Sequence, residues 1–211
     1  MPALAVTWVV SSLACAAGAS AAEDSLRSLW ERGKPFQEFL AATDARRDTW
    51  HGNYAWGRLA DDVTRRLADL TGTWRLLVIA ESGCGDSANT IPYLAILADS
   101  AAGRLEIRVI DSKIGQGVME AHRTADGRAA TPTVILLDSA WHNAGCWVER
   151  PSNLAVWFEA AKARLGYREA LEEKYRWYDR DRGGSTHREI LSMIEQAGPG
   201  RPCGGNTRSS G

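Results

Sequence analysis

Short apolar runs alternate with segments of helical periodicity through the middle of the chain. The strand-like runs cover residues 74–80, 105–110, 133–137 and 145–148, and the helix-like segments cover residues 87–101, 115–123 and 152–165. Helices between the first strands predict a right-handed parallel crossover. Only residues 138–144 separate the last two strands, which suits an antiparallel hairpin. The sequence therefore predicts an α/β core in the order βαβαββα over residues 73–166.

Helical patterns flank this core on both sides. Residues 22–72 predict an N-terminal helical extension in which Pro35 starts a helix and residues 59–70 carry another apolar stripe. The segment Trp50–Tyr54 contains glycine and asparagine and predicts a loop between helices. This extension shows no recognisable chemistry and is interpreted as a helical layer packed on the core.

Residues 167–197 predict C-terminal helices. Charges of alternating sign over residues 168–182 are typical of an exposed helix face. Thr186 and Glu189 have the spacing of a capping box that opens the last helix. Residues 198–211 are rich in glycine, proline and serine and predict a flexible tail.

The first 21 residues suggest a removable signal. Leu4–Ala17 is apolar and too short for a comfortable membrane span, and Ala19-Ser20-Ala21 suits signal-peptidase cleavage. No lysine or arginine precedes Arg27, so the usual basic segment is missing, and a start codon placed too far upstream is the alternative. We expect an exported protein if the segment is a true signal and a cytoplasmic one otherwise.

Charge and composition narrow the classes of partner. The 45% hydrophobic content is that of a globular protein, and 25 basic against 26 acidic residues leave no basic footprint for nucleic acid or membrane surfaces. We therefore expect no nucleic-acid partner and no stable membrane insertion once a signal is removed. The four histidines are not spaced with cysteines as zinc sites require, so no metal and no cofactor are predicted.

One cysteine stands where the first strand of the core meets its first helix. The junction reads Ser82-Gly83-Cys84-Gly85-Asp86-Ser87. A thiol at a helix N-terminus lies near unpaired N–H groups and the positive end of the helix dipole, which stabilise the thiolate anion. Asp86 suits the same helix start, although its charge opposes a neighbouring thiolate. A buried structural cysteine is the alternative interpretation of Cys84.

Three features of residues 73–166 resemble the thioredoxin fold beyond the order of elements. Cys84 and Ser87 occupy the ends of a C-x-x-S run where thioredoxins carry C-x-x-C. Pro92 stands where the family has a proline that kinks the helix, and Thr131-Pro132 precedes a strand like the cis-proline loop of the family. The closest resemblance is to bacterial thioredoxin-like proteins with Cys-Gly-Asp and no second cysteine. The expected fold is thus a mixed sheet flanked by helices.

The resemblance implies roles for these residues. Cys84 would be the nucleophile that forms mixed disulfides, and Ser87 would donate a hydrogen bond to its thiolate. Thr131 and Pro132, together with Gly83 and Gly85, would contact an extended segment of a disulfide-containing protein or a low-molecular-weight thiol.

Three departures from the family limit this activity. Ser87 replaces the resolving cysteine, Gly83 replaces a tryptophan, and Val78 replaces a buried aspartate. The motif therefore cannot close a disulfide of its own.

A second thiol would have to come from elsewhere. Cys146 lies on the last predicted strand and is interpreted as a buried apolar residue, whereas Cys203 in the tail is a candidate resolving cysteine. The leading hypothesis is a thiol–disulfide oxidoreductase that acts through one cysteine. A redox-inactive thioredoxin-fold module that binds proteins is the alternative. A monothiol glutaredoxin-like iron–sulfur protein is a third interpretation, which the missing Gly-Gly-x-Asp run after Pro132 disfavours.

Overall fold

The computed structural model describes residues 25–197. Its sheet has five strands in the order β1-β3-β2-β4-β5. The strands are β1 (Lys34–Pro35), β2 (Trp74–Ala80), β3 (Leu105–Asp111), β4 (Thr133–Leu137) and β5 (Asn143–Val148). β2 is parallel to β3, whereas β4 is antiparallel to both β2 and β5. The predicted parallel crossover and the predicted terminal hairpin are both confirmed, and the two-residue strand β1 is an addition that the sequence did not indicate.

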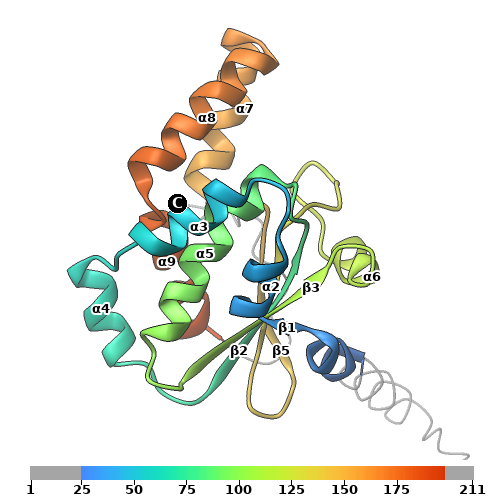
Figure 1. Ribbon diagram of the computed structural model, residues 1–211, viewed down its shortest axis with the longest axis vertical. Coiled ribbons are helices and arrows are strands. Elements are labelled where there is room, and N and C mark those ends of the chain that lie inside the picture. Colours follow the sequence, from blue (N-terminus) through green and yellow to red (C-terminus); the bar gives the residue numbers. More distant parts are fainter. Residues whose placement is uncertain (1–24, 198–211) are drawn as a thin grey trace, which may run out of the picture.

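Helices cover both faces of this sheet (Figure 1). Residues 25–32 are helical. The remaining helices are α2 (Phe36–Ala42), α3 (Arg47–Trp56), α4 (Asp61–Ala68), α5 (Gly85–Asp99), α6 (Gln116–Ala121), α7 (Ser152–Leu165), α8 (Tyr167–Asp181) and α9 (Gly184–Glu195). The expected α/β fold, βαβαββα with helical extensions at both ends, is confirmed as β2-α5-β3-α6-β4-β5-α7. The hairpin of α7 and α8 projects from one end of the domain (Figure 1).

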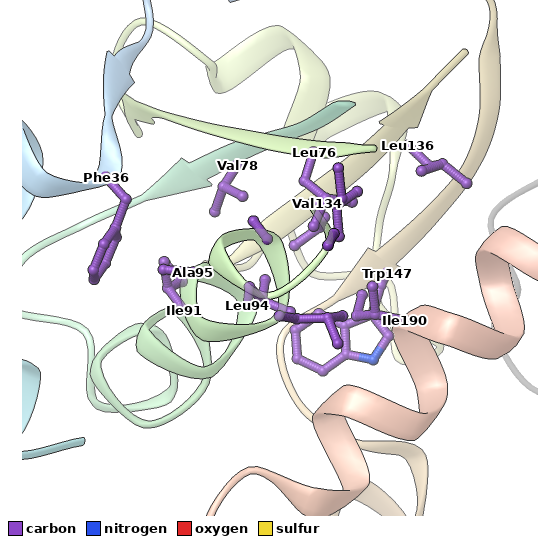
Figure 2. Packing of buried hydrophobic residues seen from close by; sticks show 14 of the residues in the cluster. Phe36, Leu76, Val78, Ile91, Leu94, Ala95, Val134, Leu136, Trp147 and Ile190 are labelled. Atoms are coloured by element: carbon purple, nitrogen blue, oxygen red, sulfur yellow. The ribbon is translucent and has the colours of Figure 1, made fainter. Parts of the chain in front are cut away.

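Alternation along the strands divides the core into two layers. Leu76, Val78 and Ala80 of β2 face α5 and α9, and Figure 2 shows Leu94, Trp147 and Ile190 meeting in this layer. Leu77 and Ile79 face the opposite layer. Successive side chains of a strand point to opposite faces of the sheet, so β2 is apolar on both sides. Because both faces of β2 are buried, the end of this strand at Ala80 is held in place. The turn that carries Cys84 begins directly after it.

Two local predictions are wrong. The predicted loop Trp50–Tyr54 lies inside α3, because Trp50 is fully buried and Asn53 Nδ2 donates to the Ala88 carbonyl at 2.9 Å. These contacts with distant residues hold as a helix a segment whose own sequence suggests a turn.

The predicted capping box at Thr186 and Glu189 is also wrong. α9 starts earlier, at Gly184. Glu189 instead accepts hydrogen bonds from Trp147 Nε1 at 2.7 Å and from the Ser152 backbone N–H at 2.8 Å.

Over residues 25–197, no helix has both the length and the apolar character needed to cross a membrane. The expected signal in residues 1–21 and the predicted flexible tail at 198–211 lie outside the described residues.

Candidate functional site

Cys84 is the N-cap residue of α5. Its φ and ψ are −74° and 124°, and its sulfur accepts a hydrogen bond from the Ser87 backbone N–H at 3.5 Å. The cysteine is partly exposed and free. An N-cap side chain normally satisfies one of the unpaired N–H groups of the first turn, and here a sulfur atom takes that place. The sequence-based position of Cys84 at a helix start is therefore confirmed.

The loop before β4 lies directly against this thiol. The Cys84 Sγ–H donates to the Thr131 carbonyl at 3.2 Å, and the Thr131–Pro132 peptide bond is cis. β2 and β4 are hydrogen-bonded neighbours, which brings the end of one strand beside the start of the other. The structure therefore gathers the candidate site residues Gly83, Cys84, Gly85, Ser87, Thr131 and Pro132.

The Ser87 hydroxyl has a different environment from the one expected. Ser87 is fully buried, and its Oγ has no hydrogen-bond partner among the described residues. The contact with sulfur comes from its backbone N–H. A hydrogen bond from this hydroxyl to the Cys84 thiolate stays a prediction.

The N-terminal extension holds the turn that precedes Cys84. Trp50 Nε1 donates to the Ser82 carbonyl at 3.0 Å, and Arg46 Nε donates to the Gly83 carbonyl at 2.7 Å. The Trp50 bond is partly buried and the Arg46 bond is exposed, and an intramolecular hydrogen bond contributes about 0.5–1.5 kcal/mol net, so both bonds tie the turn to the N-terminal extension. The sequence analysis assigned no chemistry to this extension and missed both contacts.

The C-terminal helix α8 covers the other side of the turn. A Cβ atom on Gly85 would lie 2.2 Å from Tyr175 Oη, so the hydroxyl packs where any larger residue would have a side chain. The Arg46 guanidinium carbon lies 5.6 Å from the centre of the Tyr175 ring, within cation–π range. Cys84 thus stands between the loop before β4 and helix α8.

Asp86 lies at the centre of a buried polar cluster next to Cys84. Its Oδ1 accepts from Lys174 Nζ at 2.9 Å and from the Tyr178 hydroxyl at 2.7 Å, and its Oδ2 accepts from Arg150 at 2.9 Å. The exposed fractions are 6% for Asp86, 4% for Lys174 and 9% for Arg150. The expected exposed face of α8 is therefore wrong at Lys174. Its partner Asp86 lies too far away in sequence for a charge pattern to reveal it.

Burial changes the acid–base properties of this cluster. Desolvation lowers the pKa of Lys174, and the charge of Asp86 opposes that effect. Desolvation, followed by the charge of Asp86, raises the pKa of Tyr178 well above its usual value. Tyr178 is therefore a neutral donor at physiological pH.

Ion pairs extend from the buried cluster toward the surface. Arg150 also contacts Glu149 at 2.5 Å, and Glu149 is bound by Arg128 at 3.1 Å. Arg128 in turn contacts Asp126 at 2.7 Å and, mainly through that hydrogen bond, lowers the pKa of Asp126 to about 2. Positive and negative groups alternate along this series of ion pairs, so each buried charge has a partner of opposite sign, as burial requires.

A cavity of about 320 Å³ lies between β5 and α7 and is lined in part by Trp147, Val156 and Arg150. Cys84 does not line it. The cavity and the thiol are therefore separate features of the structure.

Two further predictions concern metals and the other cysteines. Over residues 25–197, no group of three or more His, Cys, Asp or Glu side chains could hold a metal ion. Cys146 is 7% exposed on β5, as expected, but it is disulfide-bonded, which corrects its interpretation as a simple apolar residue. Cys203 lies outside the described residues.

A mixed sheet with a free cysteine at a helix start, opposite a cis-proline loop, defines the class of thioredoxin-fold proteins. Residues 33–162 match the family model Thioredoxin_9, described as thioredoxin, and the chain belongs to this family.

Two solved structures share the fold. The crystal structure of an HIV epitope-scaffold is 22% identical with a TM-score of 0.59, covering 82% of this chain and 98% of that chain. A protein of unknown function, PA1234 from Pseudomonas aeruginosa, is 22% identical with a TM-score of 0.60, covering 79% and 95%. Comparison with curated proteins gave no match.

Proposed function

We propose that this protein is a thiol–disulfide oxidoreductase that acts through the single nucleophile Cys84. The observation that carries the proposal is the position of Cys84: a free, partly exposed thiol at the N-terminus of α5, in contact with the Thr131 carbonyl. Helix N-termini favour thiolate, which is the form that attacks disulfides.

The proposed reaction has two exchange steps. The Cys84 thiolate attacks one sulfur of a substrate disulfide, which forms a mixed disulfide and releases the other substrate sulfur as a thiolate. A second thiolate then resolves this mixed disulfide. A low-molecular-weight thiolate that attacks the substrate sulfur forms a disulfide with the substrate and releases Cys84 as a thiolate. A second cysteine of the chain that attacks the Cys84 sulfur instead forms a disulfide with Cys84 and releases the substrate as a thiolate. In both cases the second thiol supplies the electrons and ends in a new disulfide. Because Ser87 has no sulfur, the second thiol belongs to a low-molecular-weight thiol or to another cysteine.

The groups that surround the Cys84 sulfur indicate which class of substrate it would bind. The Thr131 main chain lies beside Cys84, so an extended segment of a disulfide-containing protein can pair with it, flanked by Pro132 and the two glycines Gly83 and Gly85. A small disulfide such as oxidised glutathione needs less of this surface. The Ser87 hydroxyl is proposed to donate a hydrogen bond to the Cys84 thiolate.

Capture of a model disulfide tests the function. The full chain is mixed with oxidised glutathione, and the adduct is located by mass spectrometry. We expect one glutathione on Cys84 and none there in Cys84→Ser. We also expect the folded protein to react faster than the same chain in denaturant. A folded rate no higher than the denatured one would leave the redox-inactive binding module as the better assignment.

The resolving role proposed for Cys203 needs a separate measurement. Mild oxidation followed by non-reducing peptide mapping should yield a Cys84–Cys203 peptide if the tail resolves the mixed disulfide. The same map identifies the partner of Cys146, which is already disulfide-bonded. Finding Cys203 linked only to Cys146 would exclude it as the resolving thiol.

A further inference from the structure

The Asp86 carboxylate belongs to the first turn of α5, two residues after the candidate nucleophile, and it is buried, whereas Cys84 is partly exposed. A negative charge in the same helical turn disfavours a second negative charge on the Cys84 sulfur. The structure places two cations, Lys174 and Arg150, on this one carboxylate at 2.9 Å each. The formal charge of these three groups together is +1.

We propose that Lys174 and Arg150 are positioning residues for Cys84, which neutralise Asp86 and so allow the neighbouring sulfur to react as a thiolate. The proposal rests on the proposed function because it concerns the same thiol. It makes α8 part of the reactive site, although the chain reaches α8 only after the complete βαβαββα core.

Ion pairs continue outward from the cluster. Glu149 contacts Arg150, Arg128 binds both oxygens of Glu149 at 3.1 Å, and Asp126 contacts Arg128 at 2.7 Å, so these three outer groups carry −1 and the six groups together are formally neutral. Lys174 and Arg150 are the cations of this set that contact Asp86 itself. On the opposite side, the Arg46 guanidinium lies at the Gly83 carbonyl. The other ionisable groups near the turn are Asp44, which accepts from the Ser82 hydroxyl at 3.2 Å, Glu81, whose backbone carbonyl accepts from the Cys84 N–H at 3.0 Å, and the phenols of Tyr175 and Tyr178.

A buried ion cluster is weak evidence of a contribution to stability. Burying charged groups carries a large desolvation cost, and replacing a buried ion pair by well-packed apolar residues is often neutral or stabilising. The cations also lie 4.9 and 5.2 Å from the centre of the Phe158 ring, which helps to hold them beside Asp86. A costly cluster in contact with the turn of a reactive thiol is better explained by its effect on that thiol.

Three substitutions change the charge of the cluster in different directions. Lys174→Met lowers the formal charge from +1 to 0, Asp86→Asn raises it to +2, and the double variant restores +1. The readout is the rate of iodoacetamide alkylation of Cys84 in the full chain across a range of pH, with the labelled peptide identified by mass spectrometry. Lys174→Arg keeps the charge and serves as the conservative control.

We expect Lys174→Met to slow alkylation at neutral pH about threefold or more, and Asp86→Asn to accelerate it by a similar factor. The midpoints of the two pH–rate profiles should move in opposite directions, and the double variant and Lys174→Arg should react like the unmodified protein. Loosening of the fold would expose Cys84 and accelerate both single variants. Changes in the same direction, or no change, would overturn the proposal.

This outcome is separate from that of the glutathione experiment. Alkylation reports the thiolate whether or not a disulfide substrate binds. Failure of glutathione capture with the expected order of alkylation rates would reject the oxidoreductase and leave the positioning role intact. The reverse result would reject the positioning role alone.

Discussion

At the scale of single residues, Gly85 shows how closely α8 approaches the reactive turn. Gly85→Ala would place a methyl group 2.2 Å from Tyr175 Oη, so the ring must move from its position beside Arg46. We expect this crowding to destabilise the protein by about 1 kcal/mol, at the low end of overpacking costs because a phenol tip can shift. Urea unfolding measures the loss.

Gly83→Ala is the matched control for this prediction. Its added methyl would meet only the Ala45 Cβ at 4.0 Å, so the stability change should stay within about 0.5 kcal/mol. In a Tyr175→Ala background the penalty of Gly85→Ala should disappear. Equal effects of the two alanines would contradict the close approach of α8.

The residue scale also shows where sequence reasoning ends. Cys84 at a helix start and Pro132 before a strand are local features, and the adjacent residues were enough to place them. Asp86 was ambiguous in the sequence because its partners Lys174 and Tyr178 are 88 and 92 residues away. A lysine among alternating charges has the same local pattern whether it faces solvent or a buried carboxylate. Only the packing of α8 against the core determines which of the two environments Lys174 has.

At the scale of elements, α9 completes the core through apolar contact. Ile190 is fully buried, and it meets Leu94 and Trp147 in the layer between α5 and the sheet (Figure 2). Bidentate ion pairs also join α9 to α4, from Arg188 to Asp62 and from Arg66 to Glu195. These pairs are largely exposed, and such pairs contribute at most about 1 kcal/mol each. Apolar burial therefore dominates the docking of α9.

Ile190→Ala tests this ranking. Deleting the buried side-chain atoms of Ile190 leaves a cavity in a closely packed layer, so we expect a loss of about 2–5 kcal/mol. Val156→Ala is the control because Val156 is 61% exposed, and its change should stay within about 0.5 kcal/mol. Chemical denaturation of both variants gives the comparison. A loss at Ile190 no larger than that at Val156 would mean that α9 is held by other forces.

The elements that the sequence predicted well share one property. The run that became β4 is apolar over most of its length, β2 is apolar apart from Arg75, and β3 alternates apolar residues with charged ones, so these patterns needed no distant partner. α3 was missed because Gly52 and Asn53 suggest a turn, while the contacts that make it a helix reach α5. The start of α9 was misplaced because Glu189, read as part of a cap, is bound to Trp147 and Ser152.

At the scale of the whole molecule, we expect the buried His187 to make the free energy of unfolding depend on pH. His187 is fully buried, its Nε2 lies 2.9 Å from the Tyr93 carbonyl, and its Nδ1 has no hydrogen-bond partner in the described part of the chain. Desolvation lowers the pKa of His187 below its ordinary value of 6.5, against smaller opposing effects of the Tyr93 carbonyl and Asp181. Protonation would place a second buried N–H where no acceptor is available.

The sign of the effect follows from this lowered pKa. The folded state favours neutral His187, so its contribution is complete above the unfolded value and is lost as the pH falls below it toward the folded pKa. We expect the free energy of unfolding to decrease from about pH 7 to about pH 5. His187→Gln cannot be protonated and should show a smaller decrease. The remaining decrease should come from His122, whose pKa burial also lowers. Urea unfolding at each pH measures both slopes, and equal slopes in the two proteins would show that His187 is not the group that titrates.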